Sequence, residues 1–114
     1  MFIEDLEKRA AVCQAILQLV GLVEPWTAAG PGPGVVQLAR ARESDLPPAQ
    51  RAGVLLAFAL WNGEGGLTVA DMVIWLDAEH LAAIGSLFVT ASYGAEGIDG
   101  WLAEYGPAMS HHHR

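Results

Sequence analysis

Basic residues are nearly absent from the second half of this chain. Its 114 residues carry 13 Asp and Glu but only 6 Lys and Arg, which gives a formal net charge of −7. Residues 52–113 hold seven of the acids and no lysine or arginine. Nucleic acids and anionic membranes both select basic surfaces, because cations must neutralise their phosphates. The composition therefore argues against direct binding to either.

Cysteine, secretion signals and long apolar runs are also scarce. Cys13 is the single cysteine, so no intrachain disulfide can form, which is typical of a reducing compartment. The N-terminal residues are acidic where a signal peptide would be basic. The longest uncharged apolar run, Ala52–Trp61, is far shorter than the roughly 20 residues of a membrane span. We expect a single-domain, soluble, cytoplasmic protein.

Motifs that would identify an enzyme or a cofactor site are missing. No G-x-S-x-G elbow, P-loop or zinc-type spacing occurs, and we expect no cofactor and no metal. Asp77 and Glu79 near His80 are better explained as a helix cap and a first-turn acid. The remaining catalytic alternative is acid–base chemistry by Glu64 and Asp71, so the sequence favours a protein that is not an enzyme. Cys13 lies on an apolar helix face and is interpreted as a buried structural thiol.

The N-terminal part predicts one helix followed by a linker. Apolar residues recur at three- and four-residue spacing from Ile3 to Val23, and Pro25 stops the helix by Glu24. Three prolines and three glycines in Pro25–Gly34 forbid regular structure and predict a mobile connection. The N-terminal helix (1–24) and the linker (25–34) would thus precede a helical core (35–109) and a flexible tail (110–114), whose His111–His113 are a cloning remnant or disordered.

The core region predicts several short helices. Asn62-Gly63 should end a buried helix begun at Pro48, and Thr68 with Asp71 has the form of a capping box. The run Met72–Leu76 reads as helix, with a buried strand as the alternative. The predicted helices cover residues 35–43, 48–61 with Ser44 or Asp45 as cap, 68–75, 78–92 after the cap Asp77, and 98–105. We therefore predict an all-α fold, a small irregular bundle of five or six helices, with 52–61 and 81–91 most buried.

The stretch 55–77 resembles a small bacterial family, a domain of unknown function common on integrative and conjugative elements. The shared pattern is an apolar helix ending in Trp-Asn, then Glu, Gly-Gly, an apolar residue, a cap and Asp. Here it consists of Leu55-Leu56, Trp61-Asn62, Glu64, Gly65-Gly66, Leu67, Thr68, Asp71 and Asp77. The looser match covers about residues 35–105. The resemblance implies a helical fold and a mobile-element context, and it assigns no activity and no functional residue.

Aromatic and acidic residues supply the candidate interaction surface. Trp61 and Trp75 lie in apolar runs and are assigned to the core. Trp26 in the linker is either an interface anchor or folds back onto the bundle. The full candidate set is Trp26, Glu64, Glu79, Glu96, Asp99, Trp101 and Glu104.

Two functions follow as hypotheses from these features. The first is a non-catalytic, acidic protein-binding module of a mobile genetic element. It would occupy a basic or nucleic-acid-binding partner, as an inhibitor of a host defence complex of the CRISPR or restriction type. The alternative is a self-associating accessory protein that forms a homodimer through the apolar stripe from Ile16 to Val23 of the N-terminal helix.

Overall fold

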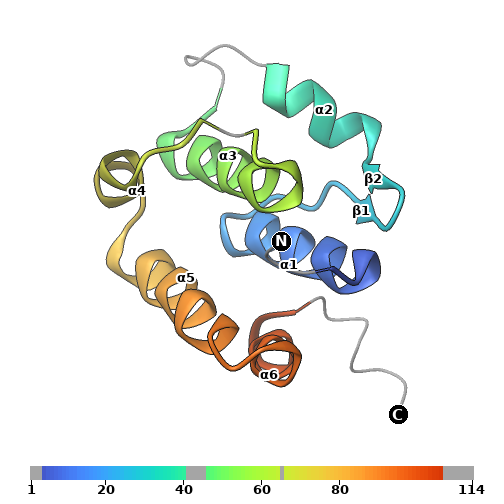
Figure 1. Ribbon diagram of the computed structural model, residues 1–114. Coiled ribbons are helices and arrows are strands. Elements are labelled where there is room, and N and C mark those ends of the chain that lie inside the picture. Colours follow the sequence, from blue (N-terminus) through green and yellow to red (C-terminus); the bar gives the residue numbers. More distant parts are fainter. Residues whose placement is uncertain (1–3, 41–45, 65, 107–114) are drawn as a thin grey trace.

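The N-terminal helix lies at the centre of the molecule. The computed structural model describes residues 4–40, 46–64 and 66–106, and Figure 1 shows the other elements arranged around this helix. The described part holds six helices and one two-stranded hairpin, which confirms the predicted all-α bundle. The elements are α1 (Leu6–Leu19), β1 (Trp26–Thr27), β2 (Gly30–Pro31), α2 (Pro33–Arg40), α3 (Pro48–Asn62), α4 (Val69–Trp75), α5 (Ala78–Ala91) and α6 (Ala95–Tyr105).

Helix α1 is more deeply buried than the sequence predicted. It contributes seven buried residues, against five from α3 and three from α5. The predicted burial of residues 52–61 agrees with α3, whereas residues 81–91 were expected to be more central than α5 is. Helix α1 contacts α3, the hairpin and α6, so it is covered from several sides. Its close packing on α3 depends on Gly53, where a Cβ atom would lie 2.7 Å from a methyl group of Val20.

Most of the apolar stripe at the end of α1 is buried inside the molecule. Ile16 and Leu17 are fully buried, and Val20 and Leu22 nearly so, whereas Val23 is 78% exposed. The expectation of self-association through the N-terminal helix rests on this stripe, which the chain covers with its own residues. A surface for a second copy must therefore be sought elsewhere.

Helix α1 ends four residues before the predicted boundary. Gly21 adopts a left-handed conformation with φ of +86°. Its N–H donates to Gln18 O and the Leu22 N–H donates to Leu17 O, which is the bonding pattern of a Schellman cap. The chain therefore leaves the helix at Gly21 and does not wait for Pro25.

The prediction that the Pro/Gly segment has no regular structure was wrong. β1 and β2 pair as an antiparallel hairpin, with Trp26 opposite Pro31 and Thr27 opposite Gly30. The side chain of Gln14 on α1 fastens this hairpin, because its amide donates to Glu24 O and accepts from the Trp26 N–H, each at 2.8 Å. Trp26 is 4% exposed and packs against Phe58 and Trp61. The tertiary contacts of the tryptophan outweigh the local preference of proline and glycine for irregular structure.

The local signals of the core region are largely confirmed. Thr68 and Asp71 form a reciprocal capping box, so residues up to Trp75 are helical rather than a strand. Asp77 caps α5, and Gly63 ends α3 with φ of +82°. Pro47 occupies the cap position of α3, and Ser44 and Asp45 lie outside the described residues. The 110–114 tail likewise falls outside them.

Two predictions for the C-terminal helices were wrong in detail. Helix α6 begins at Ala95 directly after Gly94, three residues earlier than predicted, because Gly94 with φ of +79° reverses the chain at once. Phe88 lies within the stretch 81–91, which was expected to be among the most buried, but it is 45% exposed. No helix within the described ranges has both the length and the apolar character that a membrane crossing requires.

Candidate functional site

Glu64 and Asp71, the two carboxylates proposed for acid–base chemistry, each form hydrogen bonds within their own turn of the chain. Glu64 accepts from Asn62 Nδ2 at 3.2 Å, and its backbone N–H donates to Asn62 Oδ1 at 3.0 Å. Asp71 Oδ2 accepts the Thr68 N–H at 3.2 Å, while the Asp71 N–H donates to Thr68 Oγ1 at 3.0 Å. Both carboxylates are thus engaged in local structure, and neither lines the cavities described below.

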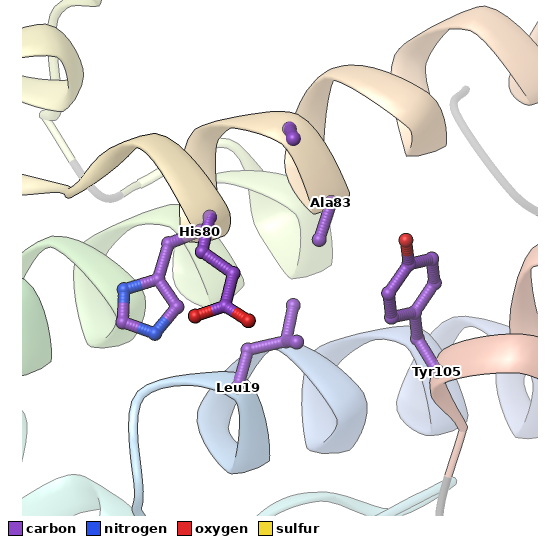
Figure 2. Close-up of a pocket in the computed structure, with 6 residues that line it drawn as sticks. Leu19, His80, Ala83 and Tyr105 are labelled. Carbon is purple, nitrogen blue, oxygen red and sulfur yellow. The ribbon is translucent and has the colours of Figure 1, made fainter.

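A cavity of about 370 Å³ opens between α1, α5 and α6. Figure 2 shows Leu19 and Ala83 facing each other across it, with His80 at one end and Tyr105 at the other. Its lining residues are Leu19, Glu79, His80, Ala82, Ala83 and Tyr105. Sequence reasoning singled out Glu79 and His80 but missed Leu19 and Tyr105, because only the tertiary packing of α1, α5 and α6 brings them together.

The polar side chains at this cavity are those of Glu79, His80 and Tyr105. His80 Nδ1 lies 3.2 Å from Asp77 Oδ1, but the contact lacks hydrogen-bond geometry. The same carboxylate oxygen accepts the His80 backbone N–H at 2.9 Å, which is its role as the cap of α5. None of the six lining residues is a serine, threonine or cysteine that such a pair could activate. The arrangement stabilises the start of α5 and borders a partly apolar cavity.

A second, smaller cavity of about 180 Å³ lies between α1 and the hairpin. Trp26 and Gln14 are among its lining residues, and both already hold the hairpin on α1. Across the described ranges no group of three or more His, Cys, Asp or Glu side chains is placed to hold a metal ion.

Cys13 is buried within the helical core. Its thiol is 0% exposed and donates to the carbonyl of Ala57 on α3 at 3.3 Å. Burial raises the pKa of the Cys13 thiol to about 12, although the Arg9 charge lowers it. The thiolate form needed for nucleophilic chemistry is therefore suppressed, in agreement with the predicted structural role.

The two tryptophans among the candidate interaction residues, Trp26 and Trp101, are buried. Trp101 is 1% exposed, donates its Nε1–H to Ala83 O at 2.9 Å and stacks against Tyr105. Trp26 folds back onto the bundle, which was one of the two alternatives for it. Neither residue anchors a partner from the surface, since the core already uses both rings. Trp61 and Trp75, assigned to the core, are half-buried.

The five candidate carboxylates are all exposed, and three of them share one helix. Glu96, Asp99 and Glu104 lie on α6, separated by the exposed small residues Gly100 and Ala103. Asp99 lies three residues and Glu104 eight residues after Glu96, and all three are exposed, so these carboxylates spread over the solvent-facing side of the helix, which we call the α6 face. Glu64 and Glu79 lie on other elements, at the end of α3 and the start of α5.

The basic residues in the described ranges do little to offset this charge. Arg9 donates to Trp61 O at 2.9 Å and lies over the Trp61 ring, while Arg51 lies over the Trp75 ring. Lys8 reaches the α6 face and pairs with Asp99 at 2.8 Å. Arg40 is exposed at the end of α2. The α6 face therefore keeps a net negative charge, with one of its three carboxylates paired.

Large apolar side chains are exposed on a different part of the molecule. Eight are exposed among the described residues, and six of these fall between residues 69 and 93. They are Val69, Val73 and Ile74 on α4, and Phe88, Val89 and Tyr93 on or just after α5. Sequence reasoning did not identify this set, and it placed Phe88 and Val89 within the stretch 81–91, which was expected to be among the most buried.

Comparison of the chain with protein-family models, with curated proteins and with solved structures finds no match.

Proposed function

We propose that this protein is a non-catalytic, acidic module that binds a basic protein partner through the α6 face. The observation that carries the proposal is the position of Glu96, Asp99 and Glu104 on one exposed helix face. Complementary charge steers two proteins together and selects among partners. An acidic helix face of this kind fits a partner with a lysine- or arginine-rich surface.

The length and composition of the α6 face support a protein partner. Glu96 and Glu104 are eight residues apart, which corresponds to about 12 Å along a helix axis. Gly100 and Ala103 between them are small, so a long basic side chain can approach the helix backbone closely. Lys8 of the same chain already pairs with Asp99. A basic partner would compete with Lys8 and extend the same contact to Glu96 and Glu104.

The context of this binding is proposed from the sequence resemblance. On an integrative or conjugative element, a protein that occupies the nucleic-acid-binding surface of a host defence complex protects the element. Such surfaces are basic because they contact phosphates. The proposed activity is therefore inhibition by occupancy, in which the acidic module and the nucleic acid exclude each other from the same surface.

Capture of the partner with charge variants tests the proposal. The full chain is immobilised and exposed to nuclease-treated bacterial lysate, and each captured protein is purified and titrated directly. The test variant is the triple Glu96→Gln, Asp99→Asn and Glu104→Gln. We expect it to weaken binding by about tenfold or more at low salt, with wild-type binding weakening as salt rises.

A matched control variant distinguishes the effect of the α6 face from the effect of the total negative charge. The triple Glu4→Gln, Glu7→Gln and Glu64→Gln removes the same formal charge from exposed positions on other elements. It should keep close to wild-type affinity. Equal loss in both triples, binding indifferent to salt, or a partner that binds together with its nucleic acid would each contradict the proposal.

A further inference from the structure

Helix α5 presents an uncovered apolar face to solvent. From Leu81 to Tyr93 the chain carries no acidic or basic side chain, yet only Ala83, Ile84 and Leu87 of the helix are buried. A helix side that carries large apolar residues is normally covered by another element. Figure 1 shows α5 at the periphery of the bundle, with α6 beside it, and α6 is its main packing partner.

Residues on the outer side of α5 follow the spacing of a helix pair, with Ala78, Ala82 and Val89 exposed and Gly85 half-buried. Ala78, Ala82, Gly85 and Val89 are separated by four, three and four residues, so they form one seam opposite the buried Ala83 and Leu87. Phe88 borders this seam, 45% exposed, and Val89 within it is 61% exposed. Tyr93, 73% exposed, extends it beyond the last turn. We call this set the α5 seam.

Gly85 has no explanation within a single copy of the chain. It stands in the middle of α5, where glycine destabilises a helix by about 1 kcal/mol relative to alanine. A Cβ atom at this position would meet nothing within 4 Å. No neighbouring element in the described structure therefore requires a residue without a side chain here. A half-buried glycine at the midpoint of the seam, with open space at its Cβ position, fits the crossing point of a second helix that approaches closely.

We propose that a second copy of this chain covers the α5 seam as an antiparallel helix pair that crosses at Gly85. The seam has small residues, Ala78 and Ala82, in its first half and large ones, Phe88 and Val89, in its second half. An antiparallel copy places the small half of one helix against the large half of the other. The seam is thus complementary to itself, as a twofold symmetric interface requires.

The absence of charged side chains from the α5 seam fits a second copy better than the basic partner of the α6 face. Two chains with a net charge of −7 repel each other, and contact through an uncharged seam keeps their carboxylates apart. An antiparallel arrangement also separates the two Asp77–Glu79 ends by about 20 Å, more than two Debye lengths at physiological salt. A basic partner would have to desolvate its cations against a seam that offers them no carboxylate. This interface is independent of the proposed function on α6.

Sedimentation equilibrium of the full chain over a wide concentration range tests the interface. We expect a monomer–dimer equilibrium in which Gly85→Leu raises the dimer dissociation constant by at least about tenfold. Val89→Glu, at a position already exposed, should do the same without disturbing the monomer. Gly100→Leu is the matched control, because Gly100 is also in a helix interior with nothing within 4 Å of its Cβ position. It should leave the dissociation constant unchanged.

Engineered cysteines report the orientation of the pair. Gly85→Cys should give a disulfide-linked dimer under mild oxidation. Ala78→Cys alone should not, whereas Ala78→Cys combined with Ser92→Cys should, because these positions meet only in an antiparallel pair. Cross-linking by Ala78→Cys alone would overturn the orientation. A chain that stays monomeric at every concentration, or a dimer equally weakened by Gly100→Leu or unaffected by Val89→Glu, would overturn the interface itself.

Discussion

Burial governs the chemistry of individual residues in the core, and Cys13 is the clearest case. Its thiol lies between α1 and α3 and donates to Ala57 O. Loss of hydration penalises the thiolate and raises the pKa of Cys13 to about 12 from an ordinary value of 9.0, although Arg9 acts in the opposite direction. The neighbouring guanidinium thus fails to make this cysteine reactive, because desolvation is the larger effect.

This pKa shift predicts a pH-dependent difference in stability. Above about pH 9 the unfolded chain releases the thiol proton while the folded chain retains it until about pH 12. Within that window the group lowers the free energy of unfolding by about 1.4 kcal/mol per pH unit, and below it the group contributes nothing. Urea unfolding of wild type and Cys13→Ala at a series of pH values measures this. The wild-type advantage should shrink steadily above pH 9, and parallel curves would contradict the assignment.

Glycine residues allow neighbouring helices to pack closely, and the clearest example is the contact between α5 and α6. A Cβ atom on Gly97 of α6 would overlap the carbonyl oxygen of Thr90 on α5. The two helices are joined by a short turn through Gly94, which leaves them no freedom to separate. Backbone contact at Gly97 therefore sets the angle at which α6 leaves α5 and lets Trp101 reach Ala83 O.

Alanine substitutions in α6 should accordingly have opposite effects. Gly97→Ala should lower the free energy of unfolding by about 1–3 kcal/mol, because Thr90 O is backbone and cannot move aside cheaply. Gly100→Ala in the same helix should raise the free energy of unfolding by about 0.5–1 kcal/mol, since its Cβ enters open space. Urea denaturation followed by circular dichroism, at one protein concentration, compares them. Equal effects of the two substitutions would show that helix propensity alone decides both.

Elements with local signals were predictable from the sequence, and those set by distant contacts were not. The capping box at Thr68 and the cap at Asp77 define α4 and α5 within a few residues of chain. The hairpin depends on Trp26 meeting Phe58 and Trp61, far away in sequence. The candidate carboxylates were correctly expected at the surface, because acids rarely lose water. The cavity was not foreseeable, since Leu19 and Tyr105 meet only through tertiary packing.

At the scale of the whole molecule, stability decreases from the centre toward α4. Helices α1 and α3 together supply half of the buried apolar residues in the described ranges, with Val12, Cys13, Ile16 and Leu17 of α1 fully buried. Helix α4 has seven residues, none of them buried, and it contacts mainly α3. Its three exposed apolar side chains gain little from folding. The capping box therefore accounts for much of the stability of this helix.

Native-state hydrogen exchange should reveal this gradient. Amide protons of α1 and α3 should exchange only through global unfolding, so their opening free energy should equal that from urea denaturation. Amides of α4 should open locally, at a free energy several kcal/mol lower and with little dependence on denaturant. Thr68→Ala, which removes the capping box, should accelerate exchange in α4 by about fivefold and leave α1 unchanged. Protection of α4 equal to that of α1 would mean that a partner or a second copy covers its Val69, Val73 and Ile74 side chains in solution.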